Sequence, residues 1–163
     1  MARLILLGGP TGVGKSTALK HLQGRIPNSA LLDADDVWRV SKDIAVSPAR
    51  PIAIGNVVSV MRGYFAANCE VGILAWVFAR SALYQPVIDG LDDLVDSAKL
   101  IYLISDLPTL ESRLAARGDT KRFEYAKSRL SLIDALPFTK IDTSNLSPIE
   151  VADRISNEIN PRD

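Results

Sequence analysis

The chain has 163 residues, of which 47% are apolar and 23% charged, a balance typical of globular proteins and unlike that of disordered ones. Its 19 basic and 19 acidic side chains cancel, so no excess of positive charge favours nucleic acid or an anionic membrane as the main partner. A single cysteine, Cys69, excludes an internal disulfide and a cysteine-based zinc site.

Apolar stretches in the chain are short. The longest, residues 71–79, falls well below the ~20 residues that cross a membrane. Residues 1–7 are too short for the apolar part of a signal peptide. We therefore predict a soluble cytoplasmic protein.

The first predicted elements are a short buried strand over residues 4–7 and a helix over 15–23. Between them the chain satisfies G-x-x-x-x-G-K-[ST], the phosphate-binding P-loop pattern, which would arise by accident in roughly 1% of chains this long. Glycines let the loop turn its N–H groups inward around phosphate oxygens, and the helix start adds unpaired donors. The residues predicted to bind the nucleotide here are Gly9, Pro10, Thr11, Gly12, Val13, Gly14, Lys15, Ser16 and Thr17.

Further along, a strand is predicted over residues 30–33, then a short helix and a mobile connection over 41–51 that contains two prolines. The later elements are predicted in the order helix 51–68, strand 71–78, helix 86–95, strand 100–104, helices 106–117 and 123–135, strand 139–142 and a last helix from Pro148. Alternating strands and helices predict an α/β protein: a single domain over residues 1–163 with the three-layer P-loop NTPase fold. We expect a five-stranded parallel sheet with helices on both faces, and ligands at the carboxyl ends of the strands.

Two carboxylates follow the second predicted strand. Asp33 and Asp35 should reach the same sheet edge as the P-loop. One carboxylate there can hold Mg²⁺, and a second, two residues on, can accept a proton from an acceptor hydroxyl during phosphoryl transfer. The alternative is that both residues only cap the short helix that follows.

Four stretches together resemble the small P-loop kinases, which include shikimate, gluconate and adenylylsulfate kinases, chloramphenicol phosphotransferase and the nucleoside monophosphate kinases. They are the P-loop, Leu-Leu-Asp-Ala-Asp-Asp at 31–36, Leu-Glu-Ser-Arg-Leu-Ala-Ala-Arg at 110–117 and Ile-Asp-Thr-Ser-Asn-Leu-Ser-Pro at 141–148. In order and spacing they span nearly the whole chain. The resemblance implies that Lys15 holds the phosphates, Ser16 and Asp33 hold Mg²⁺, and Asp35 is the base at the acceptor hydroxyl.

The resemblance also assigns roles to basic residues late in the chain. It implies that Arg117 lies against the adenine or the phosphates and that Thr143, Ser144 and Asn145 belong to the loop that borders the adenine. Residues 118–122 would form a short lid, from which Arg122 stabilises the transferring phosphoryl group. A solvated helix face is the alternative for these arginines, and it is what we expect for Arg113, Lys121 and Lys127.

Two features depart from the family pattern. The third predicted strand ends without a carboxylate, and Asp89 lies in a segment of helical spacing, so magnesium binding would depend on Ser16 and Asp33. The predicted lid is short and has few arginines, which favours an acceptor smaller than a nucleotide.

The acceptor is predicted to bind in the region of residues 36–68. Trp38 could stack on a ring, whereas Trp76, inside an apolar run, is expected in the core. Three arginines could bind an anionic group on the acceptor: Arg39, Arg62 and Arg80.

These observations predict an ATP- and Mg²⁺-dependent kinase that moves the γ-phosphoryl group to a hydroxyl of a small molecule, with Lys15, Asp35 and Arg122 as catalytic residues. One alternative has a nucleoside or nucleotide as acceptor. Another is a regulatory module that binds nucleotide without transfer, which the missing third-strand carboxylate favours. The chain lacks the N-K-x-D pattern that reads guanine, and its oligomeric state is left open.

Overall fold

The computed structural model describes residues 2–39, 49–136 and 138–160. Most of the connection predicted over 41–51 lies outside the described residues. The elements in chain order are β1 (Arg3–Gly8), α1 (Lys15–Leu22), β2 (Ser29–Asp33), a 3₁₀ turn (Ala34–Val37), α2 (Ala49–Ala66), β3 (Val71–Ala75), α3 (Ser81–Asp89), β4 (Ser97–Ile104), α4 (Leu107–Ala116), a second 3₁₀ turn (Thr120–Arg122), α5 (Phe123–Asp134), β5 (Thr139–Asp142) and α6 (Pro148–Ile159).

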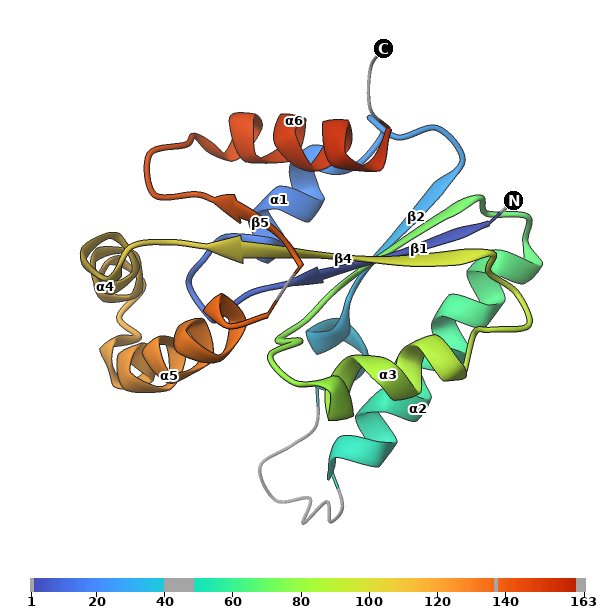
Figure 1. Ribbon diagram of the computed structural model, residues 1–163, viewed down its shortest axis with the longest axis horizontal. Coiled ribbons are helices and arrows are strands. Elements are labelled where there is room, and N and C mark those ends of the chain that lie inside the picture. The colour runs from blue at the N-terminus through green and yellow to red at the C-terminus, as the bar shows by residue number, and fades with distance from the viewer. Residues whose placement is uncertain (1, 40–48, 137, 161–163) are drawn as a thin grey trace.

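The sheet has five parallel strands in the order β2-β3-β1-β4-β5, which confirms the predicted fold class. Helices α1 and α6 cover one face, and α2 and α3 cover the other (Figure 1). Because β1 lies in the middle, the loop that follows it opens at the centre of the sheet edge, between the carboxyl ends of β3 and β4. This is the edge at which parallel α/β sheets bind their ligands.

The core has two halves, one on each face of the sheet, because successive side chains of a strand point to opposite sides. Ile5 and Leu7 of β1 pack in the half that contains the buried residues of α1 and α6. Leu4 and Leu6 pack in the half that contains those of α2 and α3. These four side chains are at most 2% exposed, so the strand that leads into the P-loop is fixed from both sides.

The boundaries that differ most from the prediction belong to β3, α3 and β4. Strand β3 ends at Ala75 and not at residue 78, because the chain leaves the sheet at Trp76, whose N–H still donates to the carbonyl of Leu7 at 3.1 Å. Helix α3 begins five residues before Pro86 and contains it, since Leu83 and Tyr84 already pack against the core. Strand β4 begins at Ser97, where exposed residues that lack an apolar pattern pair with the start of β1.

No helix in the described ranges is long and apolar enough to cross a membrane.

A buried tyrosine ties β4 to the segment that follows β3. Tyr102 is fully buried, and its hydroxyl donates to the carbonyl of Phe78 at 2.6 Å. Burial is also the main cause that raises the pKa of this phenol above its usual range. The ring leaves no room for a side chain at the end of β1, since a Cβ at Gly8 would come within 2.3 Å of it.

We predict that Tyr102→Phe lowers the free energy of unfolding by roughly 1–3 kcal/mol, because the buried carbonyl of Phe78 loses its donor. Urea unfolding followed by circular dichroism measures the change. Tyr125→Phe is the matched control, since that ring is 47% exposed. Equal unfolding midpoints for the two variants would contradict the prediction.

Candidate functional site

The P-loop links β1 to α1 in a conformation that requires glycine. Gly9, Gly12 and Gly14 have φ values of 148°, 90° and 109°, which favour glycine. Two of them are also in close contact with neighbouring elements. A Cβ at Gly9 would lie 2.7 Å from the carbonyl oxygen of Leu103, and one at Gly12 would lie 3.0 Å from the side chain of Leu114 on α4.

Lys15 folds back over this loop. Its Nζ donates to the carbonyls of Gly9 and Pro10, both at 2.8 Å. Burial lowers the pKa of Lys15 to about 8, and the carboxylates of Asp33 and Asp35 oppose that fall. The two carbonyls hold the ammonium against the loop. Burial has removed part of its water, and oxygens of a bound phosphate could take the place of that water.

The end of β2 lies directly beside the start of α1. Ser16 Oγ donates to Asp33 Oδ2 at 2.6 Å, and the other carboxylate oxygen, Oδ1, accepts from the N–H of Asp35 at 3.1 Å. Asp33 thus does cap the 3₁₀ turn, as the alternative interpretation proposed, but it also contacts the P-loop serine. Asp35 lies in the turn itself, and its side chain reaches the cavity next to the P-loop.

The pKa of Asp35 is raised, first by partial desolvation and second by the carboxylate of Asp33. Three cations, Lys15, Arg122 and Arg39, oppose this rise. A carboxylate with a raised pKa is a stronger proton acceptor than an ordinary aspartate, which is what a general base needs.

The oxygens of Ser16 and Asp33 are the hard donors that magnesium prefers. Among the described residues there is no group of three or more His, Cys, Asp and Glu side chains able to hold a metal ion alone. Magnesium in nucleotide sites takes most of its ligands from phosphates and water, with one or two from the protein. The pair Ser16 and Asp33 fits that kind of site.

A cavity of 220 Å³ is lined both by residues predicted to bind phosphate and by residues predicted to act in phosphoryl transfer. Arg117 and Arg122, from the two ends of the predicted lid, line it together with the P-loop and the end of β2. Its full lining is Thr11, Gly12, Gly14, Lys15, Ser16, Thr17, Asp33, Asp35, Trp76, Val77, Arg117, Asp119 and Arg122. Gly9, Pro10 and Val13 are absent from this lining, since the first two are buried in the loop and Val13 packs in the core.

Trp76 was expected in the core, and the structure bears this out only in part, since the side chain packs against the core without being fully buried. It is half-buried and lines the 220 Å³ cavity. Its ring packs edge-on against Phe78, with ring centroids 6.0 Å apart, and Phe78 is fully buried. The apolar run hid this position because it continues for four residues past the end of β3.

A second cavity of 320 Å³ lies on the other side of the P-loop, between α4 and the start of α6. Its walls are Gly12, Val13, Gly14, Thr17, Ala18, Arg113, Ala116, Arg117, Thr143, Leu146, Pro148 and Val151. Thr143 is 1% exposed, and its hydroxyl lies within hydrogen-bond distance of the carbonyls of Val13 (3.2 Å) and Ile104 (3.0 Å). This residue therefore connects the cavity to the P-loop.

Two expectations for this region need correction. Arg113 is not on a solvated face: its guanidinium donates to Thr143 Oγ1 at 2.9 Å and to the Thr143 carbonyl at 2.7 Å. Ser144 is not in the lining of either cavity, because its hydroxyl accepts from the N–H of Asp106 and donates to Asp142 Oδ1 at 2.6 Å. The neighbouring Thr143 faces the cavity instead. The Ile-Asp-Thr-Ser segment alone could not show which hydroxyl turns inward.

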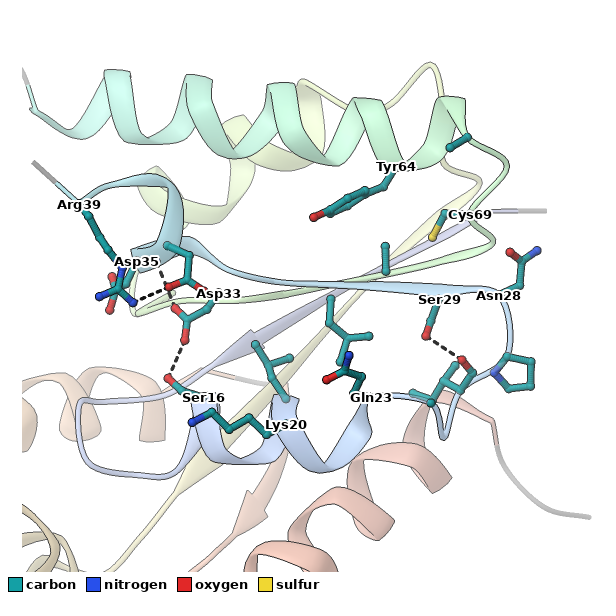
Figure 2. Close-up of a pocket in the computed structure, with 18 residues that line it drawn as sticks. Ser16, Lys20, Gln23, Asn28, Ser29, Asp33, Asp35, Arg39, Tyr64 and Cys69 are labelled. Carbon is teal, nitrogen blue, oxygen red and sulfur yellow. Dashed lines mark hydrogen bonds and ion pairs between the residues drawn. The ribbon is translucent and has the colours of Figure 1, made fainter.

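A larger open groove of 910 Å³ runs beside β2 between α1 and α2 (Figure 2). One end contains Ser16, Asp33 and Asp35, and the other contains Asn28 and Cys69. Figure 2 shows the ring of Tyr64 extending from α2 toward β2. The other lining residues are Leu19, Lys20, Gln23, Gly24, Ile26, Pro27, Ser29, Ala30, Leu31, Asp36, Arg39, Tyr64 and Ala67.

The three arginines predicted to bind an anionic acceptor are placed differently. Arg39 lines the groove but is paired with Asp36 at 2.5 Å. Arg62 forms a two-pronged pair with Asp93, both contacts at 2.6 Å, and lines none of the three cavities. Arg80 precedes α3 and is also outside their linings, as is Trp38.

Comparison with known proteins extends the fold assignment. No protein-family model and no curated protein sequence matches the chain. Solved structures do match over nearly the full length of both chains. A tunicamycin resistance protein of Deinococcus radiodurans is 20% identical, with a TM-score of 0.68 and coverage of 98% of this chain and 96% of the other. A sugar kinase from Janibacter sp. HTCC2649 is 15% identical, with a TM-score of 0.71 and coverage of 99% of this chain and 97% of the other.

A third similar structure is the adenylylsulfate (APS) kinase of Mycobacterium tuberculosis in complex with AMPPNP and APS. It is 16% identical, with a TM-score of 0.63 and coverage of 97% of each chain. At these identities the similarity establishes the fold, and the chain has the fold of the small P-loop kinases, as the sequence predicted.

The low pKa of Lys15 predicts that nucleotide binding depends on pH. The free ammonium loses its proton as pH rises through about 8, so ADP affinity should fall about tenfold per pH unit above that value. Calorimetry above about pH 7.5, where phosphate ionisation is complete, measures the affinity. Lys15→Arg is the control, because guanidinium does not titrate in this range. An affinity for the unmodified protein that stays constant to about pH 9.5 would contradict the assignment.

Proposed function

We propose that this protein is an ATP- and Mg²⁺-dependent phosphotransferase that moves the γ-phosphoryl group of ATP to a hydroxyl of a small molecule. The observation that carries the proposal is the contact between Ser16 and Asp33, with Asp35 two residues on, in one cavity with Lys15. The groups proposed to bind phosphate, to bind the metal and to accept the proton thus line one cavity. Nucleotide binding alone would not require Asp35 there.

We propose that the 320 Å³ cavity binds the purine base of the nucleotide. Its walls are largely apolar, as a purine ring needs, and its polar side chains include the guanidinium groups of Arg113 and Arg117. No carboxylate is present among its described lining residues. Guanine presents N–H donors that a carboxylate would read, whereas the ring nitrogens of adenine are acceptors. These properties favour ATP over GTP.

The phosphates of ATP would lie in the P-loop, with the γ-phosphate toward Asp35. N–H groups of the loop and the start of α1 would bind the phosphate oxygens, together with the Lys15 ammonium. Ser16 and Asp33 would hold Mg²⁺, which when bound neutralises charge on the phosphate oxygens.

In the transfer step, the acceptor oxygen forms a bond to the γ-phosphorus while the bond from that phosphorus to the β–γ bridging oxygen breaks, which releases ADP. The hydroxyl proton passes to the carboxylate of Asp35. Because the pKa of Asp35 is raised, turnover should fall as pH drops through that raised value.

The segment 118–122 is proposed as the lid. Arg122 reaches the 220 Å³ cavity and lies 3.4 Å from Asp119 in an exposed ion pair. Exposed pairs of this kind contribute little to stability, at most ~1 kcal/mol. Arg122 can therefore exchange Asp119 for the transferring phosphoryl group at low cost, while Arg117 binds the nucleotide from the other end of the segment.

One alternative is a module that binds nucleotide without transfer. The observation that favours it is the end of β3, where Trp76 follows the strand and no carboxylate is available to assist Mg²⁺. A nucleoside or nucleotide acceptor is the other alternative, and the short lid argues against a nucleotide.

Asp35→Asn separates transfer from binding. We expect turnover to fall by about 100-fold to 10,000-fold, the usual contribution of a general base, while ADP affinity is retained. A coupled assay of ADP release and calorimetry measure the two quantities. Asp89→Asn is the matched control, since Asp89 is an exposed carboxylate of α3. Unchanged turnover in Asp35→Asn would rule out the role of base.

Asp33→Asn tests the magnesium site. Asparagine also caps helices well, so the turn after β2 should survive the change. We expect the Mg²⁺ concentration for half-maximal activity to rise roughly 10-fold to 100-fold, because a carboxylate oxygen is lost. Ser16→Ala should shift it in the same direction. A magnesium dependence identical to that of the unmodified protein would remove Asp33 from the metal site.

A further inference from the structure

The proposed function leaves the acceptor open, and the side chains around Asp35 narrow its chemical class. We propose that the acceptor is a ring-containing hydroxyl compound that is uncharged or bears amines, that its ring lies against Trp76, and that anionic acceptors are disfavoured. This inference rests on the proposed function, because it concerns the acceptor side of the same site.

Trp76 is an aromatic wall in the cavity that holds Asp35. The ring is held in place by its edge-on packing against buried Phe78 and by the hydrogen bond from its backbone N–H to Leu7. The base cavity is on the other side of the P-loop, and Trp76 is not among its lining residues. A fixed, half-buried indole that faces the proposed transfer position is suited to a ring in the acceptor and not to the nucleotide base.

Two of the three arginines predicted to bind an anion are paired with carboxylates, and the third, Arg80, is outside the described linings of the three cavities. Arg39 reaches the groove with its guanidinium bound to Asp36, and both prongs of Arg62 are used by Asp93, outside the cavities. An anionic acceptor beside the negatively charged γ-phosphate would need cations of its own. Arg122 is already assigned to that phosphate.

The groove beside β2 is lined by more negative than positive side chains, so its charge disfavours an anion. Its described lining contains the carboxylates of Asp33, Asp35 and Asp36 against two cations, Lys20 and the paired Arg39. Mg²⁺ would offset Asp33, which leaves Asp35 and the phosphates facing the acceptor. The groove shares Ser16, Asp33 and Asp35 with the cavity that contains Trp76, so an acceptor whose ring lies against Trp76 can extend into its 910 Å³. Amines or neutral hydroxyls fit these surroundings.

The test uses acceptors that share a skeleton and differ in charge: glucose, glucosamine and glucuronate; uridine and its 5′-monophosphate; and the polyamine glycoside kanamycin. Trp38→Phe leaves Trp76 as the only tryptophan, since the chain has two. Quenching of Trp76 emission in the presence of ADP and Mg²⁺ then reports acceptor binding without turnover. ADP release from ATP reports transfer with the unmodified protein.

We expect neutral or amine-bearing members to quench Trp76 emission and to exceed their anionic counterparts at least tenfold in kcat/KM. Trp76→Leu should raise the acceptor KM about tenfold with little change in kcat, and Trp76→Phe should restore most of the loss because it keeps a ring. Asp36→Asn should reduce the difference in kcat/KM between neutral and anionic acceptors, because it frees the Arg39 guanidinium to bind an anion.

Tighter binding or faster turnover of the anionic members would overturn the inference, as would a panel in which no neutral or amine-bearing member quenches Trp76. Quenching by neutral or amine-bearing members without any ADP release has a different meaning. It would reject the proposed transfer reaction and leave the assignment of the acceptor site in place.

Discussion

The site depends on the two hydrogen bonds of the Asp33 carboxylate. One oxygen accepts from Ser16, at the start of α1, and the other accepts from the N–H of Asp35, in the turn that leaves β2. A strand that is separated from the P-loop strand by β3 is thereby connected to the P-loop helix. Because the cap fixes the turn, it also fixes Asp35 at the edge of the cavity that contains Lys15 and Ser16. Asp33 therefore has a structural role in the turn, and its proposed role at Mg²⁺ would use the same carboxylate.

Charge and burial act together at the P-loop. Lys15 gives up water for two backbone carbonyls, and its lowered pKa is the consequence. Asp35 is affected in the opposite direction by the same surroundings, since burial and Asp33 raise its pKa. Burial in the same site thus shifts the pKa values of Lys15 and Asp35 toward each other.

The P-loop, the parallel sheet and the carboxylates after β2 could be predicted because each depends on local chemistry: glycines at positive φ, buried apolar strands and acids at a strand end. Arg113 and Ser144 were misjudged, and Trp76 was judged correctly only in part, for a different reason. Their roles depend on where a strand ends and which neighbour is in reach, such as the carbonyl of Thr143 for Arg113. Composition and periodicity do not encode such partners, and the ion pair of Arg62 with Asp93, 31 residues apart, is a further case.

The contact of α4 with the P-loop has a mechanical consequence. Leu114 packs against Gly12, and Arg113 is tied to Thr143, so α4 is anchored to the rigid half of the molecule. Closure of the proposed lid over bound phosphates would then pivot beyond this helix. Gly118, with a φ of 69° and open space around it, is the first residue after α4 with that freedom. In the proposed mechanism, the anchored helix would confine the moving part to the short segment 118–122, which would limit how far that segment reaches across an acceptor.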